Sequence, residues 1–121
     1  MFVDYHSSRN LIAKVALGKR MAGPPWKNIY NLSEQQLIDL DTAENLIEMM
    51  DLSKAESMLL EMDKKSPNCV PILNVLAHMY GRHLSDFESA IKYYKLVLDI
   101  EPDNAWARDE RRKYTRYSSY D

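Results

Sequence analysis

The residues that could carry out chemistry are few and scattered along the chain. The three histidines and the single Cys69 do not have the spacings that bind zinc or activate a nucleophile. The sequence also has no Gly-rich phosphate loop, no HExxH and no CxxC. His78, on a predicted helix with Glu44 or Glu48 across from it, comes nearest to an acid–base pair, but a lone histidine is more typical of a surface contact. We therefore expect no catalytic residue, no metal and no cofactor, in a protein that is not an enzyme.

The composition indicates an all-α globular protein. Hydrophobic residues make up 45% and charged residues 28% of the 121 residues, which argues against disorder. Only three glycines occur, and glycine is the residue that loses most backbone entropy in a helix. The net charge of −2 gives no reason to expect the chain as a whole to bind nucleic acid or anionic membranes. A single Cys69 fits a reducing compartment, so we expect a cytoplasmic protein.

The first twenty residues leave three interpretations open. Basic residues lie on both sides of the apolar stretch 11–17 and within it, namely Arg9, Lys14, Lys19 and Arg20, as in some organelle-targeting segments. Such a segment would make the location mitochondrial. A short docking helix and a non-native extension are the alternatives. No apolar stretch reaches the ~18 residues that cross a bilayer.

A proline-rich linker predicts the domain boundaries. Residues 21–26 (MAGPPW) combine Gly23 with two prolines, each of which removes a backbone donor and disfavours helix before it. We predict an N-terminal extension and linker at residues 1–25, a helical domain at 26–117, and a polar tail at 118–121.

Five helices are predicted from apolar residues at helical spacing. The first begins at a capping box, in which Ser33 is followed three residues later by Gln36. The second helix is expected to be capped by Ser53 and to end before Pro67, and the third to stop around Gly81. The fourth is expected to run from Ser85 and to end before Pro102. The fifth is expected to run from Asp103 or Asn104 through Tyr114.

An internal repeat relates two parts of the chain. Residues 52–68 align with residues 87–104, so that Ala55 matches Ala90 and Pro67 matches Pro102, 35 residues further on. Two helices followed by a proline-bearing turn at such a period are typical of a helical solenoid. A generic five-helix bundle with the same apolar faces is the alternative.

The repeat resembles the tetratricopeptide (TPR) family over residues 37–116. The resemblance implies an α-solenoid of antiparallel helix pairs, with about two repeats and a C-terminal capping helix. Small residues, including Ala43 and Ala77, would let helices approach closely. The second unit carries the resemblance best, through Leu73, Leu76, Ala77, Tyr80, Phe87, Ala90, Tyr94 and Pro102.

The resemblance also implies a function and a site. In this family the first helices of successive pairs line a concave groove that holds a peptide or helix of a partner protein. The chain would be a non-catalytic interaction module, such as an adaptor, scaffold, co-chaperone or assembly subunit. It departs from the branch that clamps chaperone tails, since Leu40, Glu44 and Val75 replace the expected Lys and Asn residues. The expected groove positions are Leu40, Glu44, Glu48, Asn74, His78, Arg82, Trp106, Asp109 and Lys113.

The last helix offers an alternative function. Basic residues alternate there with aromatic ones, a mixture that can contact the phosphates and bases of RNA. The residues concerned are Arg108, Arg111, Arg112, Lys113 and Arg116, with Tyr114, Tyr117 and Tyr120. Against RNA binding, a terminal repeat helix needs a polar outer face for solubility, which explains the basic residues without a ligand.

The small number of repeats also favours a homodimer or a place in a larger complex.

Overall fold

A computed structural model describes residues 30–119, and no strand occurs among them. The all-α prediction is confirmed. The chain divides into two units between Asn45 and Leu46, inside the first described helix. The predicted extension and linker at 1–25 lie outside the described residues. The helices are α2 (Glu34–Glu48), α3 (Leu52–Lys65), α4 (Val70–His78), the π-helical turn η2 (Met79–His83), α5 (Phe87–Ile100) and α6 (Ala105–Ser119).

Helix α2 begins at the predicted capping box. The backbone N–H of Gln36 donates to the Ser33 hydroxyl oxygen at 3.1 Å, and the backbone N–H of Ser33 donates to Gln36 Oε1 at 2.8 Å. These two bonds pair donors that a helix start leaves unsatisfied. The short sequence signal was therefore sufficient to find this boundary.

Helix α2 ends in a Schellman turn that has a methionine at its left-handed position. Met50 has a φ of 62° and donates its N–H to the Ile47 carbonyl at 2.9 Å, while Asp51 donates to the Leu46 carbonyl at 2.9 Å. Glycine is the usual residue at this position, because it has no Cβ to crowd the backbone. Met50 is also 61% exposed, so its side chain gains little from burial.

Replacing this methionine with glycine should stabilise the protein. Met50→Gly should raise the free energy of unfolding by about 1 kcal/mol, because it removes the left-handed strain of a residue with a side chain. Urea unfolding followed by circular dichroism would measure the change. Met49→Gly is the matched control, since Met49 is equally exposed but has no positive φ. The free energy of unfolding of the control should fall by about 0.5–1 kcal/mol. A decrease in both variants would contradict the expectation.

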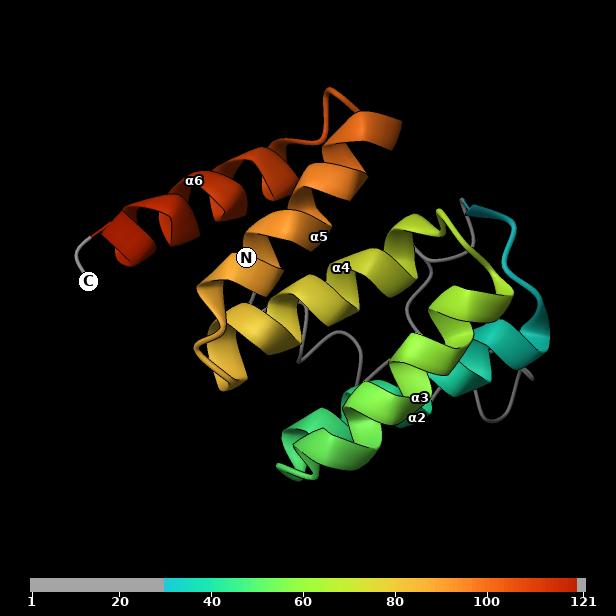
Figure 1. Ribbon diagram of the computed structural model, residues 1–121. Coiled ribbons are helices and arrows are strands. Elements are labelled where there is room, and N and C mark those ends of the chain that lie inside the picture. The colour runs from blue at the N-terminus through green and yellow to red at the C-terminus, as the bar shows by residue number, and fades with distance from the viewer. Residues whose placement is uncertain (1–29, 120–121) are drawn as a thin grey trace. The chain divides into compact units, whose positions relative to one another are not determined.

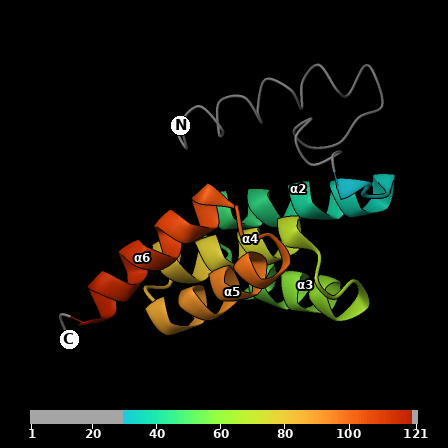
Figure 2. The same cartoon turned by 90° about the horizontal axis from the view of Figure 1, so that it is seen from above.

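In the second unit, helices α3 to α6 pack in chain order. Helix α3 contacts α4, α4 contacts α5, and α5 contacts α6, each running back along its predecessor (Figures 1 and 2). The alanines predicted at close positions, Ala55, Ala77 and Ala90, have no exposed surface. The large core side chains around them include Leu59, Leu73, Leu76, Tyr94 and Val97.

Two of the predicted helix starts in this unit are wrong by one or two residues. Helix α3 begins at Leu52 after Asp51, so Ser53 lies inside the helix and does not cap it. Helix α5 is capped by Asp86, whose carboxylate accepts from the Ser89 backbone N–H at 3.1 Å, while Ser85 lies outside the helix with a φ of 52°. Several neighbouring polar residues can cap a helix, and spacing alone does not choose among them.

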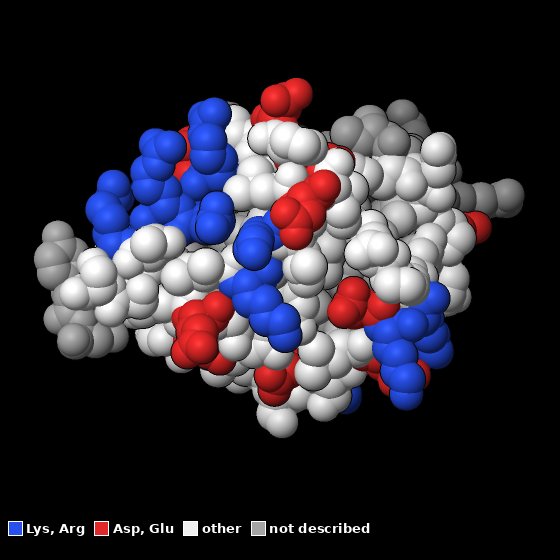
Figure 3. Space-filling view, turned by 45° about the horizontal axis from the view of Figure 1, so that its top comes forward, with Lys and Arg blue, Asp and Glu red and all other residues white. Residues whose placement is uncertain are grey.

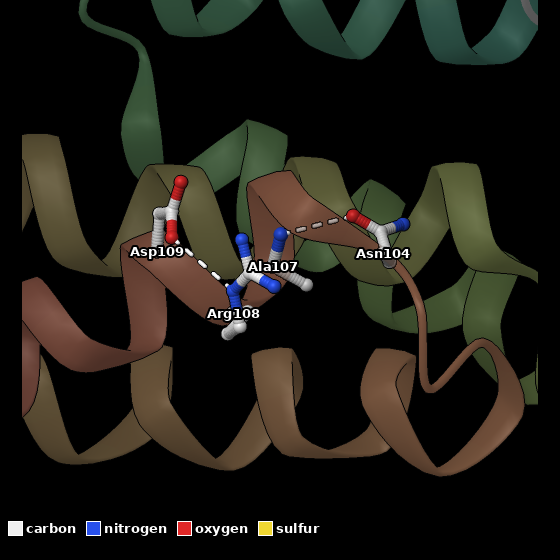
Figure 4. A network of polar contacts seen from close by, with 4 residues as sticks. All are labelled: Asn104, Ala107, Arg108 and Asp109. Carbon is white, nitrogen blue, oxygen red and sulfur yellow. Dashed lines mark hydrogen bonds and ion pairs between the residues drawn. The ribbon is translucent and has the colours of Figure 1, made fainter.

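The start of α6 is confirmed at Asn104. Its side-chain oxygen accepts from the Ala107 backbone N–H at 2.9 Å (Figure 4). The helix then continues beyond Tyr114 to Ser119. Ser118 and Ser119 of the predicted polar tail are therefore helical.

The third predicted helix does not stop at Gly81. After α4 the backbone continues as the π-helical turn η2 through His83. The Leu84 N–H donates to the Met79 carbonyl at 3.1 Å, five residues back. Such turns are rare and are frequent at functional sites, so this segment leads directly to the candidate site.

Candidate partner-binding surface

A glycine brings the end of the third helix close to α6. A Cβ atom added to Gly81 would overlap the ring of Tyr114, so only glycine leaves room for that ring. Tyr114 is 3% exposed. Its ring stacks with Phe87 at 5.6 Å and with Tyr94 at 6.3 Å between centroids. Residues from η2, α5 and α6 therefore meet at one ring.

One of the expected groove residues, Lys113, lies beside this ring, and another, Arg82, directly follows Gly81 in the chain. The Lys113 ammonium is 4.7 Å from the ring centroid of Tyr114 and 3.0 Å from Glu110 Oε2. Burial raises the pKa of Tyr114, and the charges of Lys113 and Arg82 act in the opposite direction. Arg82 is exposed and Lys113 is half-buried, so both can reach a partner molecule. The structure thus places the Lys113 ammonium at the Tyr114 ring, and Arg82 next in the chain to the glycine that approaches this ring.

Trp106 and Asp109, the other two expected positions on α6, are both on the surface. Trp106 is 38% exposed. Burial, followed by the charge of Glu110, raises the pKa of the Tyr94 hydroxyl well above its usual value, and the Trp106 side chain lowers it. Asp109 lies 3.4 Å from the Nε of Arg108, in an exposed pair (Figure 4). Exposed pairs of this kind contribute little to stability, so Asp109 can exchange Arg108 for another partner.

At the expected positions on α4, three polar side-chain atoms are buried. The Asn74 Oδ1 atom is buried and accepts no hydrogen bond from the residues that the structure describes. Both ring nitrogens of His78 are buried, and its ring lies edge-on to His83 with centroids 5.6 Å apart. The Asn74 Oδ1 atom and the two His78 ring nitrogens are therefore not presented to a ligand in this arrangement. Asn74 is therefore a weaker anchor than its residue type suggests.

The expected positions on α2 require a correction. Leu40 has no exposed surface and Glu44 is 7% exposed, so neither can contact a partner here. Leu40 and Glu44 are four residues apart, and Ile47, three residues further, is also buried. The three therefore share one face of the helix, and that face belongs to the core. Glu48, in the last turn, is exposed.

Two features of this surface were missed by sequence reasoning. Glu110 is 9% exposed, although it sits inside a run of charged residues. Its spacing from Ala107 and Tyr114, which are both buried, places it on the inner face of α6 and could have revealed it. The second feature is Glu56, whose carboxylate accepts a hydrogen bond from the Tyr80 hydroxyl at 2.6 Å. Burial, and then this hydrogen bond, raise the pKa of Tyr80. The two residues are 24 positions apart in the chain, so no local sequence signal indicates the contact.

Comparison with known proteins adds no relative. No protein-family model matches the chain, and neither a curated protein nor a solved structure shows significant similarity to it. The tetratricopeptide resemblance thus stays a prediction.

Two negative findings apply to residues 30–119 alone. No cluster of His, Cys, Asp and Glu side chains there could hold a metal ion. In the same part of the chain, no helix has the length and apolar character to cross a membrane.

Proposed function

We propose that the protein is a non-catalytic interaction module of the tetratricopeptide type. It would hold a peptide or helix of a partner protein against Arg82 of η2, the turn that continues α4, and against Trp106 and Lys113 of α6, here together called the α4–α6 surface. The observation that carries the proposal is the packing at the Tyr114 ring, where Lys113 of α6 lies 4.7 Å from the ring centroid and Gly81, the residue before Arg82 in η2, approaches the same ring. Roles as an adaptor, a scaffold or a co-chaperone, and a cytoplasmic location, belong to this proposal.

The chemistry of the α4–α6 surface suits a protein segment. Tryptophan and arginine are among the residues that contribute most to protein interfaces, because they combine apolar area with polar ends. Trp106 offers a partly exposed indole for an apolar side chain. Arg82 and Lys113 can donate hydrogen bonds to carbonyl or carboxylate oxygens. A segment with an apolar residue flanked by acidic ones would fit best.

The aromatic residues of α6 favour a protein partner over RNA. Tyr114 is 3% exposed, which leaves no ring face on which a base could stack. Tyr117 packs edge-on against Phe87 and Tyr114, with centroids 5.6 Å and 5.8 Å apart. Sequence-tolerant RNA binding depends on such stacking. The Tyr114 ring is instead used to hold α6 against α5, and Tyr117, which is 44% exposed, packs its ring against the same cluster.

Charge reversal on the α4–α6 surface tests the proposal. The double variant Arg82→Glu with Lys113→Glu should lose a partner that the parent protein captures from its own cell lysate, by at least about tenfold in recovered amount, because two charge pairs are turned repulsive. Quantitative mass spectrometry would measure the recovery. Circular dichroism must show that the variant keeps its helices.

A matched control carries the same change of charge elsewhere. Lys54→Glu with Lys95→Glu alters two exposed lysines on α3 and α5. This control should capture the partner as well as the parent does. Equal capture by the folded Arg82/Lys113 variant would refute the proposed surface.

A further inference from the structure

The outer face of α6 carries four exposed arginines, here called the arginine face. They are Arg108, Arg111, Arg112 and Arg116. At ~100° of rotation per residue they lie on one side of the helix, turned away from the buried Tyr114. Figure 3 shows basic side chains gathered over α6. In a chain with a total charge of −2, this is a strong local concentration of positive charge.

Little in the described part of the chain neutralises the arginine face. Arg108 has an exposed contact with Asp109 at 3.4 Å. Within residues 30–119, no ion pair joins the other three arginines to an acidic side chain. Glu110, the second acid of α6, is 9% exposed and pairs with Lys113 at 3.0 Å. The arginine face is therefore available to an anionic ligand.

The positions of these arginines do not serve the stability of α6. Arg108, Arg112 and Arg116 follow at intervals of four residues, where like charges on a helix repel each other. Arg108 is the fourth residue of the helix, and the first turn, where the helix dipole favours negative charge, has no acidic residue. Only Arg116, in the last turn, stands where the dipole favours a cation. An anionic ligand along this face would relieve the repulsion.

The choice of arginine over lysine indicates a ligand that carries phosphate or carboxylate groups. Helices α3 and α5 together have five lysines and no arginine, whereas α6 has four arginines and one lysine. The lysine ammonium is a compact charge, but the planar guanidinium group of arginine can donate two parallel hydrogen bonds to one phosphate or carboxylate. A face that only kept α6 soluble would not need this geometry.

The arginine face lacks the apolar side chains on which protein and membrane contacts depend. The side chains between its arginines are Thr115 and Ser119, both exposed. Trp106 and Tyr117, the large exposed apolar residues of α6, project from the side opposite Arg108 at ~100° per residue. Protein interfaces use aromatic and apolar anchors, and membrane-surface helices bury an apolar face. A ligand bound through its phosphates alone fits better.

We propose that α6 binds duplex DNA, with the arginine face on the phosphates that border the major groove, and without reading the base sequence. Duplex DNA has one phosphate per about 1.7 Å of its axis, so the ~12 Å between Arg108 and Arg116 span about seven phosphates. The major groove of B-form DNA admits an α-helix, whereas that of A-form RNA is deep and narrow. Single strands bind by stacking their bases on aromatic rings, and the arginine face has none.

The salt dependence of binding gives the first test. The full chain would be titrated into a fluorescent DNA duplex of about 20 base pairs, and binding would be followed by fluorescence anisotropy. If all four arginines contact phosphates, log affinity should fall with log salt at a slope of about −3.6, or about 150-fold between 0.05 M and 0.2 M salt. No binding at 0.05 M salt by about 0.1 mM protein, or a slope near zero, would overturn the proposal.

A paired substitution locates the contact. Arg112→Gln with Arg116→Gln should weaken binding at least about tenfold at 0.05 M salt and reduce the slope to about −1.8, because two phosphate contacts are lost. Glutamine is a good helix former, so α6 should persist, as circular dichroism would show. The control Lys54→Gln with Lys95→Gln removes the same charge from α3 and α5 and should bind like the parent. Equal weakening by the control would mean that net charge, and not the arginine face, attracts the DNA.

Competition identifies the class of ligand. Double-stranded RNA, single-stranded DNA, polyglutamate and vesicles with about 30% phosphatidylserine should each displace the duplex at least about tenfold less well than unlabelled duplex DNA, at equal concentration of charged groups. Equal or better displacement by one of them would assign the arginine face to that competitor and overturn the proposal. The inference goes beyond the proposed function, which is tested separately through Arg82 and Lys113 by capture of a protein.

Discussion

Tyr114→Ala should lower the free energy of unfolding by about 3–5 kcal/mol, as expected for a buried aromatic ring cut back to a methyl group. The ring is 3% exposed and stacks with Phe87 and Tyr94. Its loss would remove the main aromatic contact between α6 and the rest of the second unit. Urea unfolding followed by circular dichroism measures the change.

Tyr117→Ala is the matched control for this prediction. Tyr117 is on the same helix and contacts the same Phe87, but it is 44% exposed. Its replacement should cost about 1 kcal/mol or less, as is usual for surface positions. Equal losses at positions 114 and 117 would show that Tyr114 is not the side chain that anchors α6.

Gly81→Ala should destabilise the protein by about 1–3 kcal/mol, because the added methyl group overlaps the Tyr114 ring and forces the helices apart. The sign of this change in stability is informative. In a helix with free space, alanine is better than glycine by about 1 kcal/mol. A loss of stability would therefore report the close approach of Gly81 to Tyr114.

A double-mutant cycle separates this contact from any other effect at position 81. In a Tyr114→Ala background the overlap is gone, so Gly81→Ala should become neutral or stabilise by up to about 1 kcal/mol. The coupling between the two positions is read from the same urea curves. An unchanged cost in both backgrounds would mean that Gly81 is required for its backbone conformation and not for the Tyr114 ring.

Local signals in the sequence were enough to predict where α2 and α6 begin. Ser33 with Gln36, and Asn104 before Ala105, form the expected caps, because capping depends on residues within three positions of each other. The stop expected at Gly81 was wrong for the opposite reason. That glycine serves a ring 33 positions further along the chain, and nothing near it in the sequence reports this contact.

The site was predicted less well than the fold. Periodicity identifies the faces of a helix, but it does not say which faces are covered once the chain has folded. Leu40 and Glu44 were expected to line a groove and are buried, and the Asn74 Oδ1 atom and both ring nitrogens of His78 are buried as well. Arg82 and Lys113 remained on the surface. Sequence placed them on different helices, and only the structure showed that Lys113 and Gly81, the residue before Arg82, pack against the same Tyr114 ring.

Photo-crosslinking tests the central claim, a partner held at the α4–α6 surface, most directly. A photo-reactive amino acid would replace Arg82 in one variant and Lys95 in another, and both would be illuminated in lysate. The account predicts a crosslinked product of defined mass from position 82 and none from position 95, with the crosslink to 82 competed away by unlabelled parent protein. A product from position 95 alone, or equal products from both positions, would contradict it.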